Sequence, residues 1–229
     1  MLERLIDESH RFFTIYNAMF FGQAMAATFL LSAVGCIVGS AIGLVIAVLR
    51  RTHGITLLPL RFLLITFVEF FRRVPVLVIL MLVFFAFNVF KIDIPLFIVA
   101  VIGMSVVATA FMAEIIRAGI DSIHHNQWDA AAAMNFGFWR TIIIVIMPQS
   151  WKVIVPPAFS FFLVFIKDTA FASQIGVLEL TYAGRVFNQK GFSAMLVFGT
   201  VLILYFVVSY PLSHLGTWLE ARLAVSRHH

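Results

Sequence analysis

AMAATFLLSAVGCIVGSAIGLVIAVL, residues 24–49, contains no charged side chain. A helix of this length is about 39 Å long and exceeds the roughly 30 Å of hydrocarbon in a bilayer. Small residues recur at every fourth position along it, at Gly35, Gly39, Gly43 and Ala47. Positions four apart share one helix face, and small side chains there let a second backbone approach closely. The stretch therefore predicts a membrane-spanning helix that packs tightly against a neighbouring helix.

The rest of the chain is similarly apolar. Of its 229 residues, 62% are hydrophobic and 12% are charged, and the mean hydropathy is +1.03. This composition excludes an ordinary soluble domain, which needs a polar surface. Four further stretches have the length of a span: residues 57–90 with a break near Pro75, 95–113, 153–178 and 192–218. We expect an all-α integral membrane protein, a single domain over residues 1–229 with about five transmembrane helices in the lipid bilayer.

The positions of the basic residues predict the orientation. If the N-terminus lies outside, ten of the 16 Lys and Arg residues fall on the inner side and six on the outer side. Cytoplasmic loops usually carry this excess. We therefore expect the N-terminus outside, the C-terminus in the cytoplasm, and the polar segment of residues 114–149 as a cytoplasmic loop. Topology also accounts for the formal charge of +5, so no nucleic-acid partner is expected.

Within that segment, residues 126–137 carry the signals of a short capped helix. Asn126 is a favoured N-cap, and Asp129 completes a pair that is similar to a capping box. Ala130–Ala133 favour the helix, and Gly137 supplies a left-handed position to end it. The helix has about ten residues, too few to cross a membrane. The residues alone leave two interpretations open: a rod that docks into another protein, or a connector resting on the membrane surface.

This stretch resembles the signature loop of ABC importer permeases, in which an acidic residue and two alanines precede a glycine and a hydrophobic-proline pair. The matching residues are Asp129, Ala130, Ala131, Gly137 and Met147-Pro148. Asp129 replaces the usual Glu, Met147 replaces the usual Leu, and the family's glycine usually lies where this chain has Asn135. Asn also tolerates the left-handed conformation, so both positions are candidates for the turn. The resemblance implies that this is a coupling helix that contacts a cytoplasmic ATPase through Gln127, Trp128, Asp129, Ala130, Ala131, Asn135 and Gly137.

Five segments resemble, in order, the permeases that import polar amino acids of the histidine, glutamine and glutamate type. They are FVEFFRRVP at 67–75, AEIIRAGIDSI at 113–123, PQSWKVIVPP at 148–157, KDTAFASQIGVLEL at 167–180 and LEARL at 219–223. The resemblance implies a permease subunit in the bacterial inner membrane. It further implies a second permease subunit, identical or homologous, and a periplasmic or extracellular amino-acid-binding protein. A related importer for another small polar solute is the alternative.

The sequence contains no Gly-x-x-x-x-Gly-Lys-Ser/Thr loop to bind the phosphates of ATP. The resemblance therefore implies separate ATPase subunits that bind ATP and Mg. This chain is expected to be no enzyme, with no catalytic residues and no cofactor of its own. Its seven histidines show no metal-ligand spacing, so no metal site is predicted. A self-sufficient secondary carrier usually contains internal repeats, and none is evident.

Ionisable residues next to apolar runs form two groups, which are candidate sites because charge is costly at membrane depth. Glu69, Arg72 and Pro75 form a candidate gate, and Glu69 can pair with Arg73 one helical turn away. The alternative is an ion pair at the membrane surface. Lys167, Asp168 and Thr169 form a candidate substrate path, because a Lys and an Asp complement the two charged ends of an amino acid. The alternative is a mutual ion pair that only stabilises the fold.

Overall fold

The computed structural model describes residues 8–52 and 54–223, and the regular elements among these residues are all helical. The chain divides into two compact units, each assembled from stretches that are distant in sequence. Among the described residues, the first unit comprises 8–35, 76–104 and 163–212, and the second comprises 36–52, 54–75, 105–162 and 213–223.

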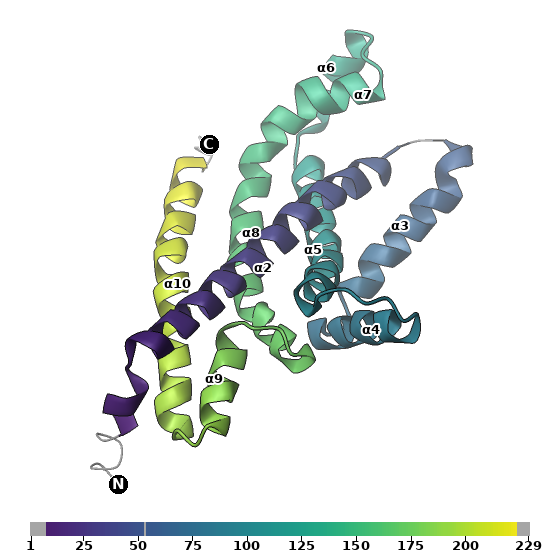
Figure 1. Ribbon diagram of the computed structural model, residues 1–229. Helices are drawn as coiled ribbons and strands as arrows, with labels where there is room; N and C mark the ends of the chain where they lie inside the picture. Colours follow the sequence, from purple (N-terminus) through teal and green to yellow (C-terminus); the bar gives the residue numbers. More distant parts are fainter. Residues whose placement is uncertain (1–7, 53, 224–229) are drawn as a thin grey trace. The chain divides into compact units, whose positions relative to one another are not determined.

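The α-helices are joined by short connections, as the ribbon in Figure 1 shows. Their bounds are α2 Ile15–Leu49, α3 Leu58–Phe71, α4 Val76–Val89, α5 Leu96–Asp121, α6 His125–Ala133, α7 Phe138–Arg140, α8 Met147–Asp168, α9 Leu180–Gln189 and α10 Ala194–Leu223. Segments of 3₁₀ helix lie at Ile55–Leu57 and Thr169–Ile175, and a π-helical segment lies at Thr141–Ile146. The π segment directly precedes Met147-Pro148, where the proline nitrogen has no hydrogen to donate to the preceding turn.

Four helical stretches among the described residues are long and apolar enough to cross a membrane: α2, α5, residues 138–175 and α10. The segments Ile55–Phe71 and Val76–Val89 meet the same criterion together, as a pair interrupted next to Pro75. The prediction of an all-α membrane protein with about five spans is therefore confirmed, with four spans if the interrupted pair is not counted and five if it is one span.

Several predicted ends were wrong because hydropathy marks the apolar part of a helix and not its full length. The first span begins at Ile15 in place of residue 24, and the last covers Ala194–Leu223 in place of 192–218. The third continues past residue 113 to Asp121, so the start of the predicted loop is helix. Charged side chains three and four apart stabilise this extension, since Arg117 pairs with both Glu114 and Asp121.

The fourth span also differs from the predicted range of residues 153–178. The continuous helical stretch covers residues 138–175. Within it, α8 begins at Met147 and contains Pro156 and Pro157. It ends at Asp168, where the chain continues as 3₁₀ helix to Ile175. Gly176 then stops the helix with a left-handed φ of 88°, a conformation that glycine adopts without steric cost.

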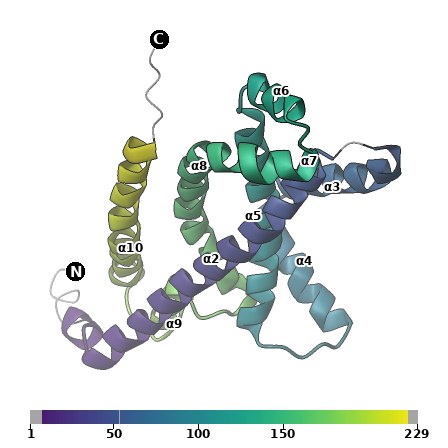
Figure 2. The same ribbon diagram turned by 90° about the horizontal axis from the view of Figure 1, so that it is seen from above.

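The core of the first unit brings α9 and α10 together with the start of α2, and Figure 2 shows α9 from above. Phe21 of α2 stacks on Phe187 of α9, with ring centroids 5.0 Å apart. The backbone N–H of Leu180 donates to the hydroxyl of Thr28 at 3.1 Å. Helix α9 was not predicted, because it is amphipathic and too short to cross a membrane.

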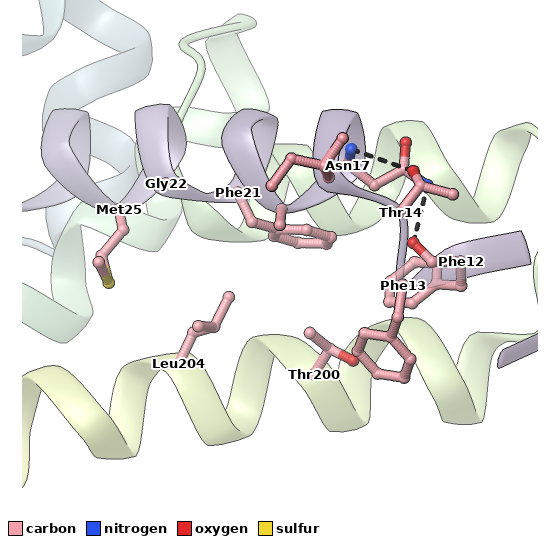
Figure 3. Close-up of a pocket in the computed structure, with 11 residues that line it drawn as sticks. Phe12, Phe13, Thr14, Asn17, Phe21, Gly22, Met25, Thr200 and Leu204 are labelled. Carbon is pink, nitrogen blue, oxygen red and sulfur yellow. Dashed lines mark hydrogen bonds between the residues drawn. The ribbon is translucent and has the colours of Figure 1, made fainter. Parts of the chain in front are cut away.

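An apolar groove of about 440 Å³ lies between the start of α2 and α10 in the same unit. Figure 3 shows Phe21, Gly22 and Met25 along α2 facing Leu204 of α10. At one end of the groove, the side-chain amide of Asn17 donates to the carbonyl of Phe12 at 2.8 Å. None of the described residues that line the groove is charged.

The second unit is built on close approach between α2 and α5. A Cβ added to Gly39 would lie 2.4 Å from the Cβ of Ala108, and one added to Gly43 would lie 2.8 Å from the nitrogen of Ala113. Neither distance leaves room for a side chain, so the predicted tight packing of this glycine face is confirmed. Isoleucines from the π segment and α8 complete the core against α5, among them Ile142.

Candidate coupling surface and charged sites

The short helix predicted around Asp129 is present as α6, but its start was predicted wrongly. His124 is the N-cap, and its Nδ1 accepts from the backbone N–H of Asn126 at 3.2 Å. Asn126 is therefore inside the helix, and Asp129 lies beyond the first turn, where it contacts His125 Nδ1 at 2.9 Å. A neutral imidazole nitrogen can accept a hydrogen bond as an amide oxygen does. The general preference for Asn at the N-cap therefore did not determine where this helix begins.

The end of α6 depends on Asn135 and not on Gly137. Asn135 has a left-handed φ of 59°, its N–H donates to the carbonyl of Ala132 at 2.9 Å, and the N–H of Phe136 donates to Ala131 at 3.0 Å. These two hydrogen bonds form a Schellman motif. Gly137 is extended, with φ −72° and ψ 163°, and it caps α7. The prediction of a left-handed Gly137 was wrong, and the alternative at Asn135 is confirmed.

One face of α6 is attached to the second unit. Ala131 is fully buried, and Trp128 packs against the isoleucine core. The guanidinium of Arg51 lies over the Trp128 ring, 4.7 Å from its centroid, and Gln127 accepts from the amide of Gln149 at 3.0 Å. Thus three of the seven predicted coupling residues fasten the helix to its own subunit.

The other predicted coupling residues point outward. Asp129, Ala130, Asn135 and Gly137 are exposed, and the exposed surface continues over Ala132, Ala133 and Met134. Alanines give this face a low profile without long flexible side chains. The helix is thus attached to its own subunit along one face and exposes a short, mostly alanine face on the other. Such a surface is suitable for rigid docking to a partner protein.

A charged network that the sequence analysis missed lies beside the attached face. Glu114 on α5 is its centre, since it contacts Arg117, accepts from Arg50 Nη1 at 3.1 Å, and lies 3.7 Å from Arg72 Nη1. Arg117 also contacts Asp121. Glu114 and Arg117 three positions apart were the available signal, but nothing local links them to an arginine 64 residues earlier.

Asp121 connects this network to α6. Its carboxylate pairs with Arg51, the residue that stacks on Trp128. Partial burial and the nearby positive charge of Arg117 lower the pKa of Arg51 below its usual range. An arginine stays charged even so, and the chain Glu114–Arg117–Asp121–Arg51–Trp128 joins α5 to α6.

The residues of the candidate gate have different partners. Arg73 donates to Glu69 Oε2 from Nη2 at 2.7 Å and from Nε at 3.2 Å, so the predicted pairing one turn apart is confirmed. This pair is solvent-accessible, with 78% of the Arg73 side chain exposed. Arg72 contacts Glu114 instead, and Pro75 lies at the interruption between α3 and α4.

The three candidate path residues lie at the end of α8 in the first unit. Lys167 is exposed and Asp168 half-buried, and no direct ion pair joins their side chains in the part of the chain that the structure describes. Thr169 is fully buried and donates to the carbonyl of Ile166 at 2.6 Å. Its hydroxyl hydrogen therefore serves the local fold, whereas neither charged group forms an ion pair with another of the described residues.

Glu179, a carboxylate that follows the candidate path residues, is fully buried. It caps α9 by accepting from the N–H groups of Thr181 at 2.9 Å and Tyr182 at 2.6 Å, and it accepts from the Tyr205 hydroxyl at 2.9 Å. Burial raises the pKa of this carboxyl, and the hydrogen bonds oppose the rise. Sequence could have indicated the cap, since Glu179 precedes a helix, but not its burial.

Comparison with known proteins is consistent with this arrangement. The family described as "Binding-protein-dependent transport system inner membrane component" matches residues 39–225. The probable amino-acid ABC transporter permease protein YckA of Bacillus subtilis is 32% identical over 186 residues, 81% of this chain and 81% of that protein. The glutamine transport system permease protein GlnP of Escherichia coli is 33% identical over 196 residues, 82% of this chain and 88% of that protein.

Solved structures agree with the sequence relatives. The crystal structure of an amino acid ABC transporter with histidines matches with a TM-score of 0.83 and 27% identity, over 91% of this chain and 96% of that chain. An inward-facing structure of the MetNI methionine ABC transporter shares the fold, with a TM-score of 0.79 and 21% identity, over 93% of this chain and 100% of that chain.

Proposed function

The chain belongs to the family of binding-protein-dependent transport system inner membrane components, and on that basis we propose that it is a permease subunit of an ATP-driven amino-acid importer. The names of its relatives support amino acids as the cargo, since they include general amino-acid and glutamine permeases. A related importer of another small polar solute is the alternative. The sequence offers no internal repeat in favour of a self-sufficient carrier.

The exposed alanine face of α6 is the observation that carries this proposal. A coupling surface must transmit force, so it should be rigid on its own subunit and smooth toward the partner. The Arg51–Trp128 stack and the Gln127–Gln149 hydrogen bond supply the rigid attachment. Ala130, which is exposed, lies on the smooth face. A cytoplasmic ATPase subunit is the partner that fits, with ATP and Mg bound there.

The proposed assembly contains further partners. A second permease subunit, identical or homologous, forms the translocation path with this chain, and a periplasmic or extracellular binding protein delivers the amino acid. The chain lies in the bacterial inner membrane with its N-terminus outside and its C-terminus in the cytoplasm, which places α6 on the side of the ATPase. Lys167 and Asp168 lie along the path, and Glu69 and Arg72 beside the gate.

Reconstitution tests this function. The complex isolated through a tag on this chain is placed in proteoliposomes with ATP inside, and each of twenty ¹⁴C-labelled L-amino acids is supplied outside with the binding protein. We expect ATP-dependent accumulation of one or a few amino acids. Accumulation without any ATPase subunit would show a secondary carrier instead, and accumulation of none of the twenty would contradict an amino-acid importer.

A further inference from the structure

The arginines of the second unit outnumber the carboxylates available to them. Glu69 is taken by Arg73, and Asp121 is taken by Arg51 and Arg117. Glu114 therefore faces Arg50, Arg72 and Arg117 as the one carboxylate among three guanidinium groups. All three form ion pairs with Glu114, but they differ in whether they also donate a hydrogen bond to it.

Arg72 is the arginine of this trio whose guanidinium makes no hydrogen bond to the described residues. Arg117 reaches both oxygens of Glu114, and Arg50 donates to Oε2 at 3.1 Å. Arg72 Nη1 lies 3.7 Å from Oε1, beyond hydrogen-bond distance, and its buried Nε has no partner in the described residues. A buried donor without an acceptor is unfavourable, so this guanidinium is suited to bind an additional acceptor.

Glu114 also retains capacity on the same side. A carboxylate offers about four acceptor positions. Glu114 Oε2 accepts from Arg117 Nε and from Arg50 Nη1, whereas Oε1 accepts only from Arg117 Nη2 among the described residues. Oε1, the oxygen nearest Arg72, therefore keeps one position free. A free cationic donor set and a free anionic acceptor thus lie side by side.

Both groups line one pocket of about 270 Å³ within the second unit. The remaining wall is apolar and includes Phe111, Ile115 and Val153. The Arg72 guanidinium lies 5.9 Å from the centre of the Phe111 ring, so the charged end adjoins the apolar wall directly. The volume is below the roughly 300–1,000 Å³ of pockets for drug-sized ligands, which suits a smaller molecule.

We propose that this pocket binds a free amino acid, with Arg72 holding the carboxylate, Glu114 Oε1 accepting from the ammonium group, and the apolar wall receiving the side chain. Arginine suits this role because its planar fork can donate two parallel hydrogen bonds to a carboxylate. The assignment rests on the proposed function, since it makes the pocket a station for the transported amino acid inside the permease. It assigns Arg72 to the cargo itself and not only to a gate.

Direct binding tests the pocket separately from transport. Each of the twenty ¹⁴C-labelled L-amino acids is equilibrated with the purified complex in nanodiscs, without the binding protein. We expect at least one to bind, and its carboxamide to compete at least tenfold more weakly. Arg72→Gln should weaken binding about tenfold or more and make acid and carboxamide equal competitors. Arg73→Gln, the same change at the neighbouring exposed arginine, should change binding less than twofold.

A second variant covers the case in which Arg72→Gln does not assemble. Ala118→Leu fills the pocket from its apolar wall without changing any charge, and it should abolish binding while Glu114 keeps its arginines. Binding that persists in Ala118→Leu would overturn the proposal. So would a wild-type complex that binds no amino acid, or one that does not discriminate acid from carboxamide. ATP-dependent uptake by that same complex would show that the proposed function survives without this pocket.

Discussion

Glu179 in the first unit and Glu114 in the second are carboxylates in largely apolar surroundings, but their partners differ in charge. Glu179 is fully buried and accepts hydrogen bonds from two backbone amides and the Tyr205 hydroxyl. Glu114 is surrounded by guanidinium groups and is 19% exposed. Neutral donors need an acceptor, whereas guanidinium groups also need a negative charge between them. The first unit therefore depends on hydrogen-bond geometry at its carboxylate, and the second depends on charge.

Glu114→Gln and Glu179→Gln should separate these two cases most strongly. The first change leaves Arg50, Arg72 and Arg117 facing one another, and we expect a loss of about 3 kcal/mol in the free energy of unfolding. The second retains a side-chain oxygen for the backbone amides and should cost about 1 kcal/mol. Thermal unfolding of the purified protein in detergent measures both. Equal losses would show that charge does not distinguish the two sites.

The packing around α2 also differs between the two units. Its glycines face a side chain that can move in the first unit and backbone atoms that cannot in the second. Gly39→Ala in the second unit would place a Cβ 2.8 Å from the backbone carbon of Ala108, and we expect a loss of about 2 kcal/mol. Gly35→Ala in the first unit would meet the ring edge of Phe165 at 3.0 Å, which can shift, so the loss should be smaller.

Gly22→Ala is the matched control for both glycine changes. Nothing lies within 4 Å of a Cβ at this position on the same helix, so alanine should be neutral or slightly stabilising. If all three variants unfold at the same temperature, the close approach of α2 to α5 is not limiting for stability.

Lys167 and Asp168 sharpen the comparison, because these neighbouring charges of the first unit form no ion pair with the described residues, unlike Glu114. If Lys167 contacts the cargo, Lys167→Met should lower uptake about tenfold, or roughly 1.4 kcal/mol, while the complex still hydrolyses ATP. If the two residues only stabilise each other, the single variant should fail to assemble. In that case adding Asp168→Asn should restore assembly and transport, and restored transport would refute a contact with the cargo.

The end of α6 offers a comparison between left-handed Asn135 and extended Gly137 of the second unit. Asn135→Val places a β-branched residue in the left-handed conformation and should cost about 1–2 kcal/mol, weakening the stimulation of ATP hydrolysis by cargo. Gly137→Val should be tolerated, since Gly137 is extended and a Cβ there meets nothing within 4 Å. Asn135→Gly is the control that keeps the turn. Normal stimulation in Asn135→Val would argue against a coupling role for this helix end.

The smallest expected effect is the pH dependence of the first unit. Because the folded-state pKa of Glu179 is raised, the folded protein binds this proton more tightly than the unfolded chain does. The resulting stability is complete below the ordinary glutamate pKa and is lost as the pH rises through the raised value. The unfolding temperature should therefore fall over that interval in the wild type and fall less in Glu179→Gln. An identical slope in both proteins would contradict this assignment.

The sequence by itself determined the features that depend on near neighbours. Long apolar runs required helices in lipid, because a bilayer offers backbone groups no other partners. The fourfold spacing of Gly35, Gly39 and Gly43 predicted a contact face, and four alanines predicted a short helix. The i, i+4 spacing of Glu69 and Arg73 predicted their ion pair. Each of these features is determined within a few helical turns of the chain.

Tertiary structure decided which of several locally acceptable alternatives is used. Asn126 and His124 can both cap a helix, and Asn135 and Gly137 can both turn left-handed. Burial of Ala131 and the stack of Trp128 on Arg51 accompany the choice of His124 and Asn135. The partners of Glu114 come from three separate stretches of chain, so the pairing becomes visible only after folding. Periodicity describes one helix at a time, whereas an ion pair between helices depends on how their backbones pack.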